Sequence, residues 1–302
     1  MDAARDRGRR LTAGAPVLLV NPRSGESEPS AEALADAARS RGIDVRLLAS
    51  GDDPKQVARE AAGGGATALG MAGGDGSLGA VASVAVDHDL PFACIPFGTR
   101  NHFARDLGLD GDDPIGALAV FSGRERRVDV GSVGEIVFVN NVSLGLYASL
   151  VHDSAGATKN RLRAGMRMFP AAFGRSRQPL DLTLDDGGRA TRLRAFIVLV
   201  ANNDYALDAI SDLGGRSRLD EGRLHAYVVE AVGRFRLAVL LGRALAGRVG
   251  EVRGYSDHSA ETLQVDARRP RVHVAVDGEP AVLPAPLDFR IRPRALRVLV
   301  TS

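Results

Sequence analysis

The feature that most constrains the fold is an apolar run that leads into a glycine-rich loop and then into a helical pattern. The apolar run is Thr67–Met71, the loop follows at 72–76, and the helical pattern covers 77–87. Glycines allow positive φ and let backbone N–H groups approach a ligand closely. Ser77 is expected to cap the helix. Because a helix N-terminus binds anions, the loop is predicted to hold phosphate with Asp75 inside it.

Strands and helices alternate over the first 126 residues, which predicts a parallel α/β sheet. The expected strands are 17–20, 45–48, 67–71 and 91–96, and the expected helices are 30–41, 53–62, 77–87, a short one ending at 107, and 114–121. Ligands of such sheets bind at the carboxyl ends of the strands. Small or polar residues follow three strands, at 21–25, 72–77 and 98–101. These segments are predicted to converge on one site.

The pattern changes after residue 126 to short strands with few helices, which indicates a second, mostly antiparallel β domain. The expected strands are 127–133, 136–143, 180–184, 193–201, 224–229, 252–256, 263–266, 272–276 and 287–291, with helices at 147–155, 160–173 and 235–246. We expect a disordered tail at 1–14, an α/β domain at 15–126, a β-rich domain at 127–292, and a return of 293–302 to the first domain.

Composition excludes several classes of protein. The chain of 302 residues is long enough for two domains. Its formal net charge of +2 gives no indication of nucleic-acid binding. The single cysteine, Cys94, has no partner for a disulfide or a zinc cluster, which fits a reducing cytoplasm. No apolar run approaches the roughly 18 residues of a membrane-spanning helix, and 1–14 lacks the apolar core of a signal peptide.

Other glycine-loop families require residues that this chain lacks. Gly74-x-Gly76-x-x-Gly79 matches the dinucleotide-binding fingerprint, but the next strand ends at 95–98 without the acid that would hold a ribose. A protein-kinase loop needs a strand lysine just downstream, and none is present. The P-loop motif G-x-x-x-x-G-K-[ST] is absent too. A plain glycine-rich turn is the remaining alternative, and it weakens once the other two strand ends are considered.

Three motifs together resemble those of the diacylglycerol kinase catalytic family, which includes bacterial lipid kinases, sphingosine kinases and ceramide kinases. They are Asn21-Pro22-Arg23-Ser24-Gly25, Gly73-Gly74-Asp75-Gly76-Ser77 and Gly98-Thr99-Arg100-Asn101-His102-Phe103-Ala104. Further on, 219–224 is similar to the family's "DG-x-L" strand entry, and 277–279 matches its "DGE" motif. The resemblance covers about 17–300. NAD kinases share the GGDG loop, but the element at 98–101 favours the lipid-kinase branch.

The resemblance implies an ATP- and Mg²⁺-dependent kinase. Its parallel α/β nucleotide-binding domain would be like that of NAD kinase and phosphofructokinase, and its second domain a mostly antiparallel β-sandwich that takes the lipid. Asp75 is well placed to hold Mg²⁺, which prefers carboxylate oxygens and retained waters. Backbone amides, the metal and Arg23 or Arg100 would hold the phosphates. The residues implied to bind nucleotide are Asn21, Ser24, Gly25, Ala72, Gly73, Gly74, Asp75, Gly76, Ser77, Leu78, Gly98, Thr99, Arg100 and Asn101.

The resemblance also implies catalytic roles for Asp277 and Glu279 beside Asp75. Valines alternate over 272–276, so a strand ends at these acids, and Gly278 indicates a turn. A lipid hydroxyl that attacks ATP benefits from a carboxylate base. The family's proton acceptor maps to Glu279, with Asp277 in support. A solvated hairpin tip without catalytic function is the alternative.

Residues 218–223 resemble a structural Mg²⁺ site of bacterial family members, which uses one carboxylate and flanking backbone oxygens. Glu221 stands where the family usually has aspartate, and the flanking carbonyls belong to Arg218 and Arg223. A plain β-turn without metal is the alternative. The histidines in this half show no metal-ligand spacing and are predicted to be structural: His225, His258 and His273.

Two basic stretches with interleaved apolar residues are candidates for contact with anionic membranes. The first, 159–177, has six basic residues and no acid, and the second is 235–245. Helices that pack on the core with a solvated face are the alternative. We therefore expect a cytoplasmic protein, peripheral on the inner membrane face, that meets a lipid substrate and ATP but no nucleic acid. Homodimer formation is left open.

The chain departs from the family pattern at several positions. Gly79-Ala80 replaces Asn-Glu after the glycine loop, His102 replaces Asp after Asn101, and Leu48 lies near the usual position of a nucleotide-contacting threonine. Two other functions are kept as alternatives: a soluble kinase that acts on NAD or a sugar phosphate, and a non-catalytic regulator that binds nucleotide or lipid. The retained acids Asp75, Asp277 and Glu279 favour catalysis over the second alternative.

Overall fold

The computed structural model describes residues 14–24, 29–98, 101–145, 179–205, 215–231 and 255–301. The chain divides into two compact units, the first formed by Met1–Val130 with Arg294–Ser302 and the second by Gly131–Pro293. The predicted helices at 147–155, 160–173 and 235–246, both basic stretches, and nearly all of the tail at 1–14 lie outside the described residues. The predicted fold class, a parallel α/β domain followed by a mostly antiparallel β domain, is confirmed.

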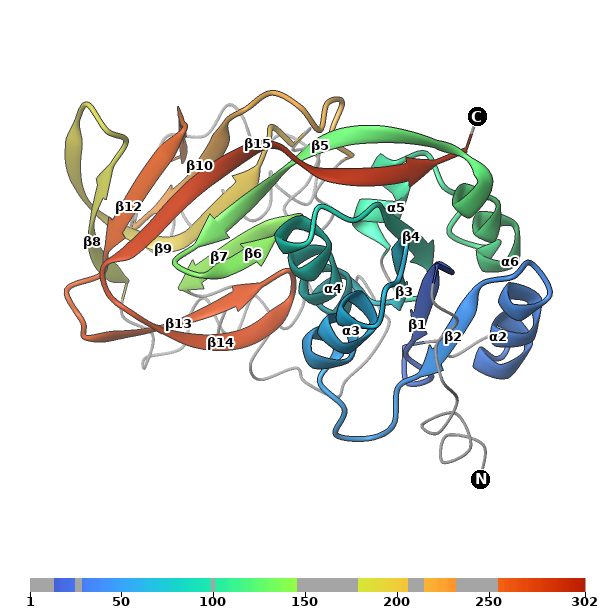
Figure 1. Ribbon diagram of the computed structural model, residues 1–302. Coiled ribbons are helices and arrows are strands. Elements are labelled where there is room, and N and C mark those ends of the chain that lie inside the picture. Colours follow the sequence, from blue (N-terminus) through green and yellow to red (C-terminus); the bar gives the residue numbers. More distant parts are fainter. Residues whose placement is uncertain are drawn as a thin grey trace. The chain divides into compact units, whose positions relative to one another are not determined.

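The first unit contains a parallel sheet in the order β4-β3-β1-β2. Its strands are β1 (Val17–Val20), β2 (Asp44–Leu47), β3 (Leu69–Gly73) and β4 (Phe92–Pro96). The side chains of β1, β3 and β4 are all buried, as expected for parallel strands with both faces covered. The helical segments are α2 (Ala31–Arg39), α3 (Pro54–Gly63), α4 (Asp75–Asp87), α5 (His102–Asp106), α6 (Pro114–Ala117) and the 3₁₀ helix η1 (Leu118–Ser122). Figure 1 shows α3 beside α4, and α2 beside α6.

Side-chain caps begin several of the described helices. Ser30 Oγ accepts from Ala33 N–H at α2, and Asp53 accepts from Lys55 N–H at α3. The prediction that Ser77 caps α4 was wrong: this helix begins at Asp75, and the cap is Gly74. Strand β3 continues to Gly73, so little loop separates strand and helix. Asp75 lies in the first helical turn, where the helix dipole favours a carboxylate.

The second unit is built from antiparallel pairs in the order β14-β13-β7-β9-β8-β12-β15, with β10 and β11 following from β9 and the end of β5 pairing with β6. Strand β5 up to Val130 and strand β15 from Arg294 belong to the first unit. The strands are β5 (Arg124–Val133), β6 (Ile136–Phe138), β7 (Asn141–Gly145), β8 (Leu180–Asp185), β9 (Ala190–Asn202), β10 (Leu224–Glu230), β11 (Tyr255–Ala260), β12 (Thr262–Asp266), β13 (Arg271–Val276), β14 (Glu279–Pro284) and β15 (Leu287–Val300). Inward-facing aliphatic and phenylalanine side chains form one core. Phe138 and Phe289 meet there edge to face, with centroids 6.4 Å apart.

Three parts of the sheet differ from the sequence prediction. The segment 136–143, expected as one strand, forms two, β6 and β7. Strand β14 was not predicted, because it carries Pro280 and Pro284. In the structure its Val282 is 41% exposed. Proline is tolerated at the end of a sheet, where β14 lies. Strand β15 is one long strand rather than two segments. It pairs antiparallel with β12 through Phe289 and parallel with β4 through Val298, so the same strand serves both units.

We predict that Asp129 stabilises the change of backbone direction at Arg294 in β15. Asp129 is 1% exposed, its Oδ1 accepts from Arg294 N–H at 2.7 Å, and Arg294 has φ +52°. Asp129→Ala should lower the free energy of unfolding by about 1–3 kcal/mol, because the amide loses a charged acceptor. Asp129→Asn, which keeps an acceptor oxygen, should lose less. Urea unfolding measures both, with the exposed Asp288→Ala on the same strand as control. An equal loss for Asp129→Ala and Asp288→Ala would contradict this role.

Candidate functional site

The structure brings the ends of β1, β3 and β4 together within the first unit. Asn21 N–H, just after β1, donates to Ala72 O at 2.9 Å, and Gly74 N–H donates to Ser24 Oγ at 3.3 Å. The loop after β4 also packs against the glycine loop: a Cβ built at Gly98 would lie only 2.7 Å from Gly74 Cα. The three segments therefore form one surface at the carboxyl edge of the sheet, where such folds bind ligands.

Asn101 fixes the shape of the loop that follows β4. It adopts the left-handed conformation, with φ 48° and ψ 40°, which asparagine tolerates better than most residues. Its Oδ1 accepts from Gly98 N–H at 2.8 Å. Asp75 Oδ1 contacts Phe103 N–H at 3.5 Å, so the carboxylate of the glycine loop also reaches the start of α5. The neighbouring Thr99 and Arg100, like Gly25, lie outside the described residues.

The glycine loop leaves space at one position. A Cβ added at Gly74 would meet nothing within 4 Å, whereas one at Gly73 would lie 2.6 Å from Met71 Cε. Gly73, Gly74 and Gly76 all have negative or extended φ, so the loop does not use the positive φ that glycine allows. Asp75, Gly76 and Ser77 are half-buried in the first turn of α4, next to the open position. Ala72 and Leu78 are fully buried beneath them, so their side chains serve packing.

The second unit holds Asp277 and Glu279 in a tight hairpin. Asp277 and Gly278 have φ 47° and 86°, and they form a two-residue turn between Val276 and Glu279, which pair across β13 and β14. Asp277 is 7% exposed, and its carboxylate accepts from the backbone N–H groups of Val139, Asn140 and Asn141 at 2.8 to 3.0 Å. Glu279 is exposed. The two acids thus have different surroundings: the first anchors the turn, and the second faces solvent.

Arg216 holds the other side of the same backbone segment, and sequence reasoning missed it. The guanidinium is buried, and it donates to Val139 O at 2.7 Å, to Asn202 O at 3.0 Å and to Asn140 Oδ1 at 3.0 Å. It also lies over the Tyr205 ring, 5.1 Å from the centroid. Asp277 therefore holds the three backbone amides of residues 139–141, while Arg216 holds the carbonyl of Val139 and the side chain of Asn140. No local pattern distinguishes this arginine from the many others in the chain.

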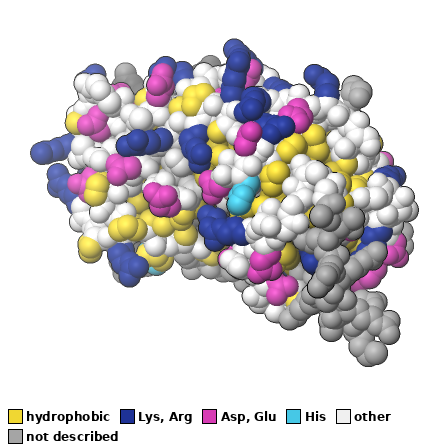
Figure 2. All heavy atoms as spheres, in the orientation of Figure 1, with side chains coloured by type: hydrophobic (Ala, Val, Ile, Leu, Met, Phe, Trp, Pro, Cys, Tyr) yellow, Lys and Arg dark blue, Asp and Glu magenta, His cyan; other side chains and the backbone are white. Residues whose placement is uncertain are grey.

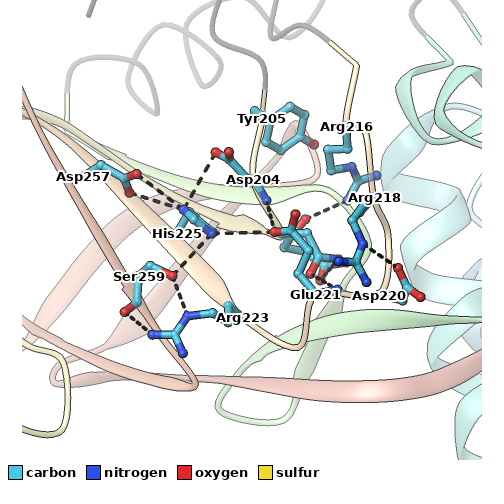
Figure 3. A network of polar contacts seen from close by, with 12 residues as sticks. Asp204, Tyr205, Arg216, Arg218, Asp220, Glu221, Arg223, His225, Asp257 and Ser259 are labelled. Carbon is cyan, nitrogen blue, oxygen red and sulfur yellow. Dashed lines mark hydrogen bonds and ion pairs between the residues drawn. The ribbon is translucent and has the colours of Figure 1, made fainter.

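In the turn at 218–223, the three residues predicted to bind a metal are accessible: Arg218 and Arg223 are exposed, and Glu221 is half-buried. Glu221 Oε2 accepts from Asp204 N–H at 3.2 Å, and Glu221 N–H donates to Asn203 Oδ1. Arg218 pairs with Asp220, while Arg223 donates to Ser259 Oγ and O, both at 2.7 Å. Figure 3 shows Glu221 directed toward His225. The metal site predicted on the carbonyls of Arg218 and Arg223 stays a prediction.

His225, which the sequence analysis treated as structural, lies among carboxylates. A hydrogen bond to Asp257 is the main cause that raises its pKa above the ordinary value, and the charges of Asp257, Asp204 and Glu221 act in the same direction against the effect of burial. Tyr227 stacks on His225 with centroids 6.0 Å apart. Burial and a hydrogen bond to Asp204 raise the pKa of Tyr227, which keeps its hydroxyl protonated and able to donate.

Comparison with known proteins agrees with this architecture. Residues 15–133 match the diacylglycerol kinase catalytic domain, and 142–300 match the YegS C-terminal NAD kinase beta sandwich-like domain. A diacylglycerol kinase of Mycobacterium tuberculosis is 28% identical over 315 residues, which cover 96% of each chain. A Pseudomonas aeruginosa protein named "Probable lipid kinase YegS-like" is 27% identical over 303 residues, 93% of each chain. A crystal structure of a diacylglycerol kinase from Bacillus anthracis shares the fold, with a TM-score of 0.67 at 15% identity over 96% of this chain and 98% of that one.

The two matches together cover almost the whole chain, in the order of the two units. The chain belongs to the family of diacylglycerol kinases and YegS-like lipid kinases, and the suspected resemblance is confirmed. Family membership supports lipid-kinase chemistry. Among the helices of the described residues, none has both the length and the apolar character needed to cross a membrane.

Two glycine substitutions compare the close contact between the loops at Gly98 with the open position at Gly74. Gly98→Ala should lower the free energy of unfolding by about 1–3 kcal/mol, because its Cβ would press on the Gly74 backbone. Gly74→Ala should change stability by less than about 1 kcal/mol, because the added methyl meets nothing within 4 Å and only the N-cap preference for glycine over alanine is lost. Urea unfolding of both variants measures the difference. Equal midpoints would contradict the contact between the loops.

Proposed function

We propose that the protein is an ATP-dependent lipid kinase that transfers the γ-phosphate to the hydroxyl of diacylglycerol or a similar lipid. The observation that carries the proposal is the meeting of the three strand ends around Gly74 and Asp75 in a chain of the lipid-kinase family. Phosphoryl transfer depends on positioning and on neutralisation of charge rather than on covalent help from the protein. A helix start with an adjacent carboxylate suits that task.

The residues at the glycine loop fit ATP and Mg²⁺. The open position at Gly74 leaves room for a phosphate against the backbone, and Asp75 offers carboxylate oxygens of the kind that Mg²⁺ prefers. Asn21, Ser24 and Asn101 set the positions of the neighbouring loops. When bound, Mg²⁺ would supply charge neutralisation at the phosphates. The amides at the start of α4 would orient the phosphate chain.

Glu279 is the proposed general base. Its side chain is exposed at the first position of β14, and the turn that carries it is anchored by the hydrogen bonds of Asp277. An exposed carboxylate can accept the proton of the lipid hydroxyl as the oxygen attacks phosphorus. Asp277 is a positioning residue in this proposal, since backbone amides occupy its oxygens.

The lipid acceptor requires access to a bilayer, and we propose peripheral binding at the cytoplasmic membrane surface. On the face drawn in Figure 2, acidic and basic side chains are interspersed among the coloured residues. The basic stretches at 159–177 and 235–245, which lie outside the described residues, remain the candidate membrane contacts. Their function and any homodimer remain proposals.

The direct test is transfer of radiolabelled γ-phosphate from ATP to total extracted lipids in mixed micelles, followed by chromatography of the lipid products. We expect one labelled lipid that grows with added diacylglycerol. Labelling of NAD or a sugar phosphate without lipid would support the soluble-kinase alternative, which the NAD kinase-like second domain makes worth testing. Binding of ATP without any phosphorylated product would support a non-catalytic regulator. Either result would refute the lipid-kinase proposal.

Two carboxylate variants test the assigned roles. Glu279→Gln should lower kcat by about 10²–10⁴-fold, the usual contribution of a general base. Asp75→Asn should lower activity and weaken the dependence of the rate on Mg²⁺ concentration. The matched controls are Glu135→Gln in the second unit and Asp87→Asn at the other end of α4, both exposed. If the two test variants were as active as their controls, the roles assigned to Glu279 and Asp75 would be wrong.

Asp277 should differ from Glu279 in its effect on folding. Asp277→Ala removes a buried acceptor of three backbone hydrogen bonds, so it should lower the free energy of unfolding by about 2 kcal/mol or more. Glu279→Gln should leave stability within about 0.5 kcal/mol, because the side chain is exposed. Urea unfolding of both variants checks this. A neutral Asp277→Ala would show that the carboxylate does not anchor the turn.

A further inference from the structure

Three potential metal ligands that are far apart in the sequence meet on one face of the second unit. His225 lies on β10, Asp257 on β11, and Asp204 just after β9. In the pairing of β10 with β11, His225 lies opposite Ser259, and Tyr227 opposite Asp257. Because side chains alternate along a strand, these residues share the face opposite the buried Leu224, Ala226 and Val228. Figure 3 shows Asp204 and Asp257 both directed at the imidazole of His225.

The distances fit ligands of a single ion. His225 Nδ1 lies 3.4 Å from Asp257 Oδ1 and 3.8 Å from Asp204 Oδ1. One ligand atom from each residue lies within 4.8 Å of the other two. Zinc bonds to nitrogen and oxygen are about 2.0–2.2 Å long, which places two ligands of a tetrahedral ion about 3.4 Å apart. Small rotations of the two exposed aspartate side chains would bring the wider spacings between these ligand atoms down to that value.

The residues around these three side chains resemble the outer shell of a metal site. Metal-bound histidines usually place the second ring nitrogen against a carboxylate or another acceptor, which fixes the orientation of the ring. Here Nε2 of His225 lies 3.4 Å from Ser259 Oγ and 3.8 Å from Glu221 Oε2. On the other side, Tyr227 OH donates to Asp204 Oδ1 at 2.6 Å. Two ligands are therefore held by neighbours, independently of any ion.

The charges of the cluster also favour a cation. Three carboxylates, those of Asp204, Glu221 and Asp257, lie within 4 Å of the imidazole. The nearby arginines are engaged elsewhere, since Arg218 pairs with Asp220 and Arg223 donates to Ser259. Even a protonated imidazole leaves two negative charges, which a divalent ion on Nδ1 of the neutral ring would lower to one. Mixed imidazole and carboxylate donors suit zinc, manganese and related transition ions.

We propose that Asp204, His225 Nδ1 and Asp257 form a binding site for a divalent transition-metal ion, with Glu221 and Tyr227 as its outer shell. The site differs from the Mg²⁺ site expected at 218–223, in which Glu221 itself and the carbonyls of Arg218 and Arg223 would be the ligands. It uses a nitrogen ligand, which Mg²⁺ disfavours. The proposal does not depend on the kinase activity.

A bound ion would join three segments of the second unit: the end of β9, β10 and β11. Metal binding to the folded chain stabilises it by mass action, so the thermal midpoint should rise with metal concentration. Protons compete for the imidazole, so the affinity should fall as the pH is lowered.

The test is titration of the untagged, chelator-treated protein with Co²⁺ alone, without nucleotide or lipid, while visible absorption is recorded. Zn²⁺ is then added to compete with the bound Co²⁺. We expect one equivalent of Co²⁺ to give ligand-field bands that Zn²⁺ abolishes. His225→Gln and Asp257→Asn should remove the bands, and Glu221→Gln should weaken binding about 10–100-fold. The control is His273→Gln, an exposed histidine on β13 that should bind as the unaltered protein does. Circular dichroism confirms that each variant is folded.

Two outcomes would overturn the proposal. Absence of saturable Co²⁺ and Zn²⁺ binding by the unaltered protein is one. The other is loss of binding in Glu221→Gln together with retention in Asp257→Asn, which would place the ion on the 218–223 turn. Asp257 is partly exposed, so its variant keeps the test decisive if His225→Gln fails to fold. Neither outcome would bear on phosphate transfer, which the radiolabel assay measures separately.

Discussion

The carboxylate of Asp277 determines much of the second unit's organisation. It accepts three backbone hydrogen bonds from residues 139–141, and Arg216 binds the same segment through Val139 O and Asn140 Oδ1. A buried carboxylate and a buried guanidinium are costly unless their hydrogen-bonding groups are satisfied. Here both are satisfied largely by backbone, so the start of β7 and the turn after β13 are fixed together. The exposed Glu279 owes its position to that arrangement.

Much of the first unit could be predicted from local patterns. Short apolar strands followed by small or polar residues specify a parallel sheet and its ligand edge, because both follow from the order of elements along the chain. The details that failed depend on the exact join between elements. Ser77 is a good capping residue, but β3 runs to Gly73 and the helix starts at Asp75, so the serine falls inside the first turn. The capping preference of serine has no effect there, because the end of β3 determines where α4 begins.

The second unit was less accessible to sequence reasoning, because antiparallel pairing joins distant segments in a register that no local pattern encodes. Arg216 looks like any other arginine until residues 139–141 lie beside it. Asp204, His225 and Asp257 likewise show no metal-ligand spacing, and only the pairing of β10 with both β9 and β11 brings them together. Strand β14 escaped prediction for a different reason: its prolines are acceptable only at the end of a sheet.

Strand β15 has a consequence for the order in which the protein can fold during synthesis. Val298 pairs with Phe92, so the edge of the first sheet at β4 receives its neighbour only after the entire second unit has left the ribosome. Until then β4 presents unpaired backbone groups that can recruit other strands. N-terminal domains generally fold first as units, but this one is discontinuous in sequence. Its completion is therefore a late event, and the nascent chain is most exposed to misassociation at this edge.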